Sequence, residues 1–311
     1  MGAASRRRSR SDAGAAFLFL APNLAGFLLF TLLPLAASLV LSFTDWQMLN
    51  PEVRFVGFGN FVRLLGFSVT PQGWQPNDPA FWHYLYNTVF LLLGVPFSMA
   101  ASLALAVLVN QRLPGVVLFR TLYYLPTICN GIAIYMLWRL LFHADLGLLN
   151  RGLSSVGIPG PDWLGATEWA KPALVVMSIW IAAGGNNMLI YLAALQGVPP
   201  ELHEAADLDG ATRWQRFRHV TWPLLAPATF FISTMSLIGG FQGGFNAAFV
   251  MTQGGPAGST TTISYYIYNT AYTGRLLMGY GCAIAWVLFL LVLAVTLLQW
   301  RQGSGSAVEG G

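Results

Sequence analysis

Six long apolar runs constrain this chain more than any other feature of its sequence. They cover residues 15–43, 84–110, 118–142, 172–196, 224–250 and 280–300. A helix that crosses a bilayer needs about 20 such residues, so each run is long enough to span once. Only 9% of the residues are charged and 55% are hydrophobic, whereas a soluble domain usually carries about 25% charged residues. The sequence therefore predicts an all-α integral membrane protein with six transmembrane helices.

The positions of the basic residues predict which side of the membrane each loop faces. Six spans place both termini on one side. If that side is the cytoplasm, it holds the larger share of the 16 lysines and arginines, including those at 6–10 and in the loop at 201–222. Such an excess marks cytoplasmic loops. We therefore expect an N-in, C-in topology, with external loops at 44–83, 143–171 and 251–279.

The same pattern predicts one membrane domain between two short tails. The expected parts are a cytoplasmic tail at 1–14, a six-span domain at 15–300 and a flexible cytoplasmic tail at 301–311. The first apolar run is roughly twice the 7–15 residues of a signal-peptide core, so we interpret it as an uncleaved span. We expect a multi-pass protein of the cytoplasmic (inner) membrane.

The charge, the cysteines and the histidines disfavour several other kinds of site. The net charge of +4 arises from basic residues near the ends of the apolar runs, so it predicts topology and not nucleic-acid binding. Cys129 and Cys282 lie within apolar runs and are interpreted as small hydrophobic residues. The four histidines are scattered without metal-ligand spacing, so we assign no metal.

The segment at 201–222 is a charged stretch between two apolar runs. Pro200 suits the first turn of a helix. Gly210 belongs to a turn signal, and Thr212 can cap a second helix. The pattern predicts a helix, a tight turn and a second helix at the inner membrane surface. The alternative is an amphipathic helix that only rests on lipid headgroups.

Residues EAADLDGA at 204–211, followed by Phe217 and Pro223, resemble the EAA loop of the permease subunits of ABC importers. The resemblance extends to FVGFGNF at 55–61 and to MTQGGPAGSTTT at 251–262. It covers nearly the whole chain in the right order, and it points to the carbohydrate-uptake permeases of the maltose, lactose and glycerol-phosphate type. Residues 15–300 would then be the permease domain, with residues 201–222 as its coupling loop.

The resemblance implies that this loop inserts into a separate ATPase subunit and passes its motion to the spans. The residues that it implies in coupling are Glu204, Ala205, Ala206, Asp209, Gly210, Ala211, Phe217 and Pro223. The other implied partners are a second homologous permease in a heterodimer, an extracytoplasmic solute-binding protein and membrane lipid.

The residues themselves agree that ATP is hydrolysed elsewhere. The one lysine, Lys171, is preceded by Ala170 and followed by Pro172, whereas a P-loop needs a glycine-rich turn that ends in Lys-Ser or Lys-Thr. We therefore expect no enzymatic activity and no cofactor on this chain, with ATP and Mg²⁺ bound by the partner ATPase.

Polar residues within the apolar runs are the candidates for solute contacts, because polar groups at mid-membrane usually face a cavity or a neighbouring helix. The candidates are Asn186, Asn187, Gln242, Phe245 and Asn246, with Asn130 as a further polar residue of the third run. Each asparagine could instead form a hydrogen bond between helices. The glycines at 239, 240, 243 and 244 match the spacing of close helix packing.

The charges absent from the spans bear on the class of transporter. The centres of the second, fourth, fifth and sixth runs contain no Asp, Glu, Lys or Arg. A proton-coupled secondary transporter normally needs a titratable relay there, so that class and a channel are disfavoured rivals, as is a non-transporting scaffold. The same absence favours an uncharged sugar, with glycerol 3-phosphate or another polyol as the alternative solute.

Overall fold

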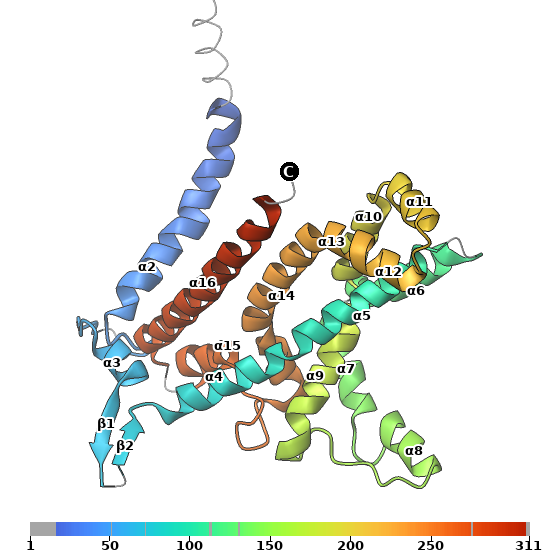
Figure 1. The fold of residues 1–311 in the computed structure, drawn as a ribbon. Coiled ribbons are helices and arrows are strands. Elements are labelled where there is room, and N and C mark those ends of the chain that lie inside the picture. The colour runs from blue at the N-terminus through green and yellow to red at the C-terminus, as the bar shows by residue number, and fades with distance from the viewer. Residues whose placement is uncertain are drawn as a thin grey trace, which may run out of the picture. The chain divides into compact units, whose positions relative to one another are not determined.

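The computed structural model describes residues 17–50, 52–71, 73–111, 114–129, 131–274 and 276–308. Helices dominate these residues, and their one sheet pairs two short strands, β1 (Phe67–Thr70) and β2 (Gly73–Pro76). The chain forms two compact units, one from residues 1–68 and 267–287 and the other from residues 69–266 and 288–311. The helical elements of both can be followed along the chain in Figure 1.

The first unit contains the N-terminal candidate span, Phe17–Ser42. Within it a π-helical turn, η1 (Leu28–Leu32), leads into α2 (Leu33–Ser42). Pro34 explains the irregular turn, because a proline inside a helix lacks the N–H donor and its ring crowds the preceding turn. The unit also contains α3 (Gly59–Leu65), the π-helical turn η4 (Asn269–Thr273) and the start of α16 (Met278–Val308).

Polar side chains hold the first unit together. Asn60 on α3 donates from Nδ2 to the carbonyl oxygens of Ser42 and Thr44, at 2.9 and 2.8 Å. Trp286 on α16 donates from Nε1 to Ser38 Oγ at 3.2 Å. The Asn60 contacts give partners to carbonyl oxygens at the end of α2, where the regular ladder of backbone hydrogen bonds stops, and the Trp286 contact joins α16 to α2.

The second unit is a helical assembly. Its elements are α4 (Pro79–Leu92), α5 (Gly94–Val109), α6 (Val116–Ile128), α7 (Gly131–Leu141), α8 (Leu148–Ser155), α9 (Thr167–Ala183), α10 (Asn186–Gln196), α11 (Pro200–Leu208), α12 (Arg213–Arg216), the π-helical turn η2 (Phe217–Thr221), α13 (Trp222–Leu224), α14 (Ala226–Ala247), the π-helical turn η3 (Ala248–Thr252), the start of α15 (Ile263–Tyr268) and the end of α16.

The described helices allow three to six membrane spans. Three stretches are long and apolar enough alone: Phe17–Ser42, Pro79–Val109 and Met278–Arg301. Three further pairs of helices pass the same test together, and counting each pair once gives six. The helix of the second apolar run begins at Pro79, earlier than expected. The Asp78 side chain caps this helix by accepting a hydrogen bond from the Phe81 N–H.

The fourth apolar run was expected to be one helix, and this expectation is wrong in detail. The run consists of the last part of α9 and of α10, which bend by 42° at the break between them. Gly184 lies at that break, and a Cβ there would collide with the Tyr123 carbonyl oxygen of α6. The glycine therefore permits a close approach of two backbones, as small residues do between membrane helices.

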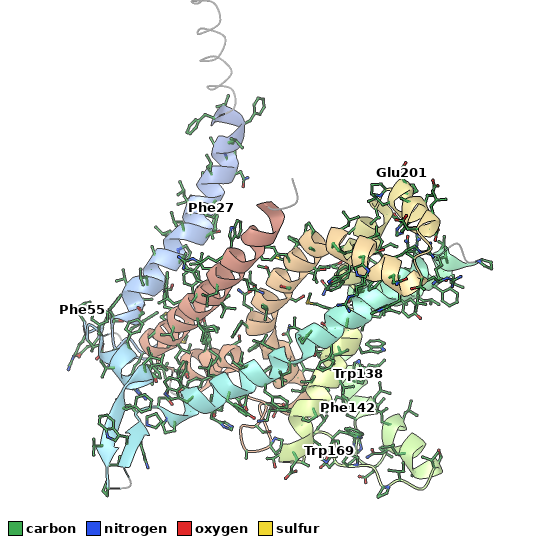
Figure 2. The ribbon with its side chains drawn as sticks, in the orientation of Figure 1. Phe27, Phe55, Trp138, Phe142, Trp169 and Glu201 are labelled. Atoms are coloured by element: carbon green, nitrogen blue, oxygen red, sulfur yellow. The ribbon has the colours of Figure 1, made fainter. Side chains whose placement is uncertain are left out.

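Two hydrophobic clusters of described residues lie in the core of the second unit. One surrounds Trp138 and Phe142, which are labelled in Figure 2, and includes Leu174 and Met177 of α9. The Trp138 ring lies 5.1 Å from Phe142 and 5.4 Å from Trp180, centroid to centroid. The other cluster joins α5, α10 and α14 through Ala106, Val109, Met188, Tyr191, Leu192 and Ile232. These clusters fix α9 and α14, which carry most of the candidate site.

Candidate functional site

The turn at Gly210 completes the backbone hydrogen bonds at the end of α11. The Ala211 N–H donates to the Ala206 carbonyl oxygen at 2.9 Å, and the Gly210 N–H donates to that of Asp207 at 3.1 Å. This pair of bonds is the Schellman motif, whose central residue adopts a left-handed conformation. Gly210 has φ +72°, a conformation that costs a residue with a Cβ about 1–2 kcal/mol.

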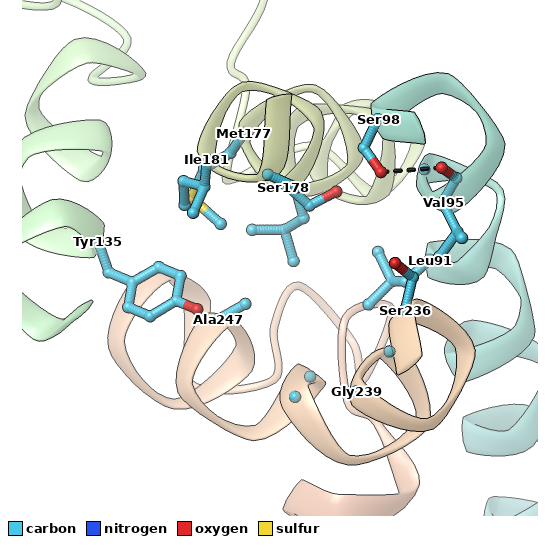
Figure 3. Close-up of a pocket in the computed structure, with 16 residues that line it drawn as sticks. Leu91, Val95, Ser98, Tyr135, Met177, Ser178, Ile181, Ser236, Gly239 and Ala247 are labelled. Carbon is cyan, nitrogen blue, oxygen red and sulfur yellow. Dashed lines mark hydrogen bonds between the residues drawn. The ribbon is translucent and has the colours of Figure 1, made fainter. Parts of the chain in front are cut away.

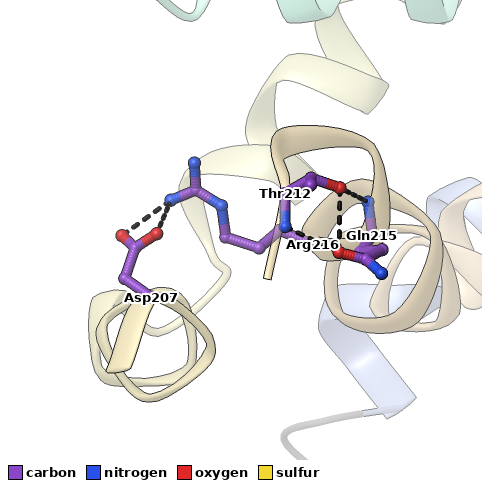
Figure 4. A network of polar contacts seen from close by, with 4 residues as sticks. All are labelled: Asp207, Thr212, Gln215 and Arg216. Atoms are coloured by element: carbon purple, nitrogen blue, oxygen red, sulfur yellow. Dashed lines mark hydrogen bonds and ion pairs between the residues drawn. The ribbon is translucent and has the colours of Figure 1, made fainter. Parts of the chain in front are cut away.

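A capping box starts α12. Thr212 Oγ1 accepts a hydrogen bond from the Gln215 N–H at 3.3 Å, and Gln215 Oε1 accepts one from the Thr212 N–H at 2.7 Å (Figure 4). The prediction that Thr212 caps a second helix is confirmed. Each bond satisfies a donor that the helix itself leaves unpaired. The turn and the helix start are thus completed by residues of the loop itself.

An ion pair joins α11 to α12. Arg216 Nη1 donates to Asp207 Oδ2 at 2.7 Å, and the two side chains are 25% and 56% exposed, respectively (Figure 4). A pair this accessible contributes at most about 1 kcal/mol, so it orients the two helices more than it stabilises them. The sequence analysis did not single out either residue, although opposite charges nine positions apart across a turn are a visible signal.

The surface of α11 is open. No residue of this helix is buried, and the Leu208 side chain is 90% exposed. Of the residues expected in coupling, Glu204, Ala205, Asp209, Gly210 and Pro223 are exposed, and Ala206, Ala211 and Phe217 are half-buried. The loop therefore presents an exposed leucine and three exposed carboxylates, those of Glu201, Glu204 and Asp207, on a helix whose C-terminal end is completed by the loop itself.

A cavity of about 250 Å³ lies among α4, α5, α7, α9 and α14. Figure 3 shows Tyr135 on one side of it, with Ser98 and Val95 opposite. Its other polar side chains are Ser178 and Ser236. None of the described residues that line it is charged. The cavity therefore offers hydroxyl groups and an aromatic ring in an otherwise apolar wall.

The four glycines of α14 fall into two pairs. A Cβ on Gly240 would collide with Leu92, and one on Gly244 would collide with Thr262. The packing prediction is confirmed for this pair. For Gly239 and Gly243 a Cβ would meet nothing within 4 Å in this chain, so close packing at this second pair stays a prediction. All four glycines line the cavity, and together with its serines they are the site residues that the sequence analysis did not assign to solute contact.

The structure does not bring the five predicted solute-contact residues together in this cavity. Asn187 Nδ2 donates to Ser236 Oγ at 3.3 Å, so Asn187 forms the interhelical hydrogen bond that was its alternative role. Asn186 Oδ1 accepts from the Tyr124 hydroxyl at 3.4 Å. Phe245 stacks on Phe249, with ring centroids 5.5 Å apart.

The two remaining candidates lie on another face of α14. Gln242 and Asn246 are exposed and are not among the residues that line the cavity. Asn130 lies outside the described residues. A role of the candidates in solute contact stays a prediction.

A second polar region surrounds the loop at 253–262. Asn87 is fully buried on α4, and its Nδ2 donates to the carbonyl oxygens of Gly258 and Thr261 at 2.9 and 3.0 Å. Its Oδ1 accepts a hydrogen bond from Lys171 Nζ on α9 at 3.1 Å. Thr88 Oγ1 accepts one from the Ile263 N–H at 3.0 Å. Side chains of α4 thus bind this loop and the residue that follows it, and Lys171 of α9 supports Asn87 from behind.

Comparisons with known proteins agree with this architecture. Residues 85–302 match the family described as "Binding-protein-dependent transport system inner membrane component". The lactose transport system permease protein LacF of Rhizobium radiobacter is 37% identical over 293 residues, which cover 91% of this chain and 92% of that protein. The arabinooligosaccharides transport system permease protein AraP of Bacillus subtilis (strain 168) is 33% identical over 308 residues, with 96% and 92% covered.

A solved structure shares the fold. One chain in the crystal structure of a bacterial alginate ABC transporter, in complex with an alginate pentasaccharide-bound periplasmic protein, superposes with a TM-score of 0.80. It is 24% identical, and the match covers 94% of each chain. This chain belongs to the family of binding-protein-dependent transport system inner membrane components. The predicted ABC-permease class and inner-membrane location are confirmed, and the chain is a membrane component of a transporter and not an enzyme.

Proposed function

We propose that this chain is one of two permease subunits of an ATP-driven, binding-protein-dependent sugar importer. It crosses the membrane six times with both termini in the cytoplasm and forms half of the translocation pathway. The observation that carries the proposal is the exposed α11–α12 loop, whose turn is completed by its own residues and whose Leu208 side chain is 90% exposed. Family membership and the sugars in the names of the relatives support the same conclusion.

The loop at 201–222 would transmit force between a partner ATPase and the spans. Burial of the Leu208 side chain in a cleft of the ATPase would contribute about 1.5–3 kcal/mol. Thr221 and Leu225 are buried where the loop meets α14, so this end of the loop is anchored. The ion pair between Asp207 and Arg216 would let α11 and α12 move as one piece, so that a displacement of α11 reaches α14.

The cavity beside α14 supports an uncharged polyhydroxy solute. Its serine hydroxyls and the Tyr135 ring can contact sugar hydroxyls and sugar faces, and no charged residue is among its described lining residues. Its volume of about 250 Å³ is below the roughly 300–1,000 Å³ of ligand pockets, so the pathway would need a second subunit to complete it. For glycerol 3-phosphate, the alternative solute, a partner would have to supply the cation.

The exposed face of α14 supports a second, different permease as the partner. Gln242 and Asn246 are exposed amides on a membrane helix, and polar groups that face lipid are costly. A homologous subunit packed on this face would cover them, and the pathway would then run between the two subunits. The external binding protein would deliver solute to this pathway.

Uptake by reconstituted vesicles tests the proposal. We expect solute uptake that requires ATP, the ATPase subunits and the binding protein, and that continues after the proton gradient is collapsed. Uptake that stops when the proton gradient is collapsed and that does not require ATP would instead identify a secondary transporter, the rival class.

A further inference from the structure

An apolar groove lies between α5 and the segment that runs from α12 to the start of α14. It has a volume of about 760 Å³ and is lined along α5 by Pro96, Met99, Leu103 and Val107. This spacing of three or four residues places them on one face of the helix, over a length of roughly 16 Å. That length is close to one leaflet, roughly half of the 30 Å hydrocarbon core of a bilayer.

Aromatic residues close one end of the groove. Trp214, Phe217 and Trp222 line it there, and the Trp214 and Phe217 rings stack with centroids 5.7 Å apart. The two tryptophans are exposed, at 66% and 45%. Tryptophan is enriched where the hydrocarbon core meets the headgroups, so this end of the groove has the composition of a membrane interface.

A polar pocket continues from the aromatic end. It has a volume of about 390 Å³ and shares Val107 and Phe217 with the groove. Its walls include His203, Arg213 and Arg216. These two adjoining pockets, together called the cleft, are apolar along α5 and basic beside α11 and α12.

The charges of this pocket favour an anion. Asp207 already pairs with Arg216, but the guanidinium has five N–H donors and can bind a second acceptor. Within the described part of the chain no carboxylate forms an ion pair with Arg213. The pocket therefore keeps an uncompensated positive charge beside an apolar groove.

We propose that this cleft is a binding site for an anionic phospholipid of the inner leaflet. The phosphate lies between Arg213 and Arg216, and one acyl chain extends along α5. The orientation rests on the proposed function, which places the α11–α12 loop at the cytoplasmic surface. Basic pockets between membrane helices on that side suit anionic headgroups, and the charge of the cleft favours such a lipid over an apolar helix of a partner subunit.

A bound lipid would support the coupling loop. Phe217 lies in both parts of the cleft and at the start of η2, the irregular turn that connects α12 to the helices of the membrane domain. Occupancy of the cleft would hold this turn against α5, so lipid composition would regulate how firmly the loop is seated.

The test measures lipid retained by the full chain, purified from membranes in mild detergent with the subunits that accompany it. Native mass spectrometry after titration with phosphatidylglycerol or phosphatidylcholine compares wild type with three variants. Arg213→Gln removes the headgroup contact. Ala104→Phe fills the groove from an exposed position of its lining. Arg218→Gln is the matched control, because Arg218 is exposed on the same loop and does not line the pocket.

We expect wild type and Arg218→Gln to prefer phosphatidylglycerol, Arg213→Gln to lose about fivefold of that preference, and Ala104→Phe to bind both lipids less. Equal losses in Arg213→Gln and Arg218→Gln would overturn the proposal. So would an Ala104→Phe variant that keeps its lipid but loses a partner subunit, because a partner helix would then fill the groove. Lipid binding is measured without ATP or solute, so failure of the proposed function would be seen separately in vesicle uptake.

Discussion

Two loops of the same unit differ in how they are surrounded. The loop at 253–262 has hydrogen bonds of its own, such as that from Thr261 Oγ1 to the Gly254 carbonyl oxygen, but Asn87 of α4 also binds it, and its residues Ser259–Thr262 are buried. The loop at 208–213 is completed by its own Schellman motif and capping box, and it is largely exposed. An exposed loop that completes its own turn leaves its surface available to a partner, whereas a buried loop bonded to a neighbouring helix serves as part of the framework.

The largest expected effect is that of Asn87→Leu, which tests whether the loop at 253–262 depends on α4. The change removes two hydrogen bonds to loop carbonyl oxygens and the acceptor of Lys171. Buried groups left without partners cost about 1–3 kcal/mol, so we expect the largest loss of stability here, about 2 kcal/mol. Thermal unfolding of the purified complex in detergent measures it.

Asn87→Asp is the matched control for this change. It keeps an acceptor for Lys171 but sets a carboxylate oxygen against the Gly258 and Thr261 carbonyl oxygens, so it should also be less stable than the wild type. If the leucine variant unfolded at the wild-type temperature, the loop at 253–262 would not depend on α4.

The second prediction compares neighbouring glycines of α14. Gly244→Val would force a side chain against Thr262, at the end of the 253–262 loop, whereas Gly243→Val would extend into open space beside the cavity. We expect the first to lower stability by about 1–3 kcal/mol, as overpacking does. The second should leave stability nearly unchanged but reduce solute uptake about tenfold. Thermal unfolding and vesicle uptake are measured on both variants. A loss of stability in Gly243→Val, together with a loss of uptake alone in Gly244→Val, would contradict this assignment.

The third prediction concerns the self-completed loop. Gly210→Val places a β-branched residue at φ +72°, a local strain of about 1–2 kcal/mol. The protein should still insert, because nothing surrounds this position, but the ATPase should be detached or uncoupled. Gly210→Asn is the control, since asparagine tolerates this conformation better. Normal ATPase binding and transport in the valine variant would show that the turn geometry is unimportant.

The smallest expected effect is that of the surface ion pair. Arg216→Gln should cost at most about 1 kcal/mol, because the pair with Asp207 is accessible to water. Coupling efficiency, measured as solute transported per ATP hydrolysed, should fall more than stability does. The exchange of both residues, Asp207→Arg with Arg216→Asp, should restore part of the lost coupling efficiency. If Arg216→Gln left the coupling efficiency unchanged and the double exchange lowered it, the ion pair would have no role in coupling.

Much of the fold was predictable because the length of an apolar run and the residues that cap a helix can be recognised from a short stretch of sequence. The apolar runs located the helices, and Gly210 and Thr212 located the turn and the second helix before any contact was known. The bend between α9 and α10 was not predicted, because the glycine there is explained by the distant Tyr123 carbonyl. Local signals cannot identify a partner so far away in sequence.

The candidate site was less predictable for a geometric reason. Neighbouring residues on a helix point about 100° apart, so Gly243 can line a cavity while Gln242 beside it is exposed on another face. Polarity singled out Gln242 and Asn246, but it could not assign the face. The open glycines carried no polar signal, and only the space beside them distinguishes Gly243 from Gly244.

The central claim is that the exposed α11–α12 loop docks a separate ATPase. The most direct measurement is affinity purification of tagged chain from membranes in mild detergent, with quantification of co-purified proteins by mass spectrometry, for wild type and Leu208→Asp. We predict that an ATPase and a second permease accompany the wild type. The aspartate variant should keep the permease and lose most of the ATPase, because a charge replaces a 90% exposed leucine without disturbing the core. Equal ATPase recovery with both chains, or none with either after cross-linking, would contradict the account.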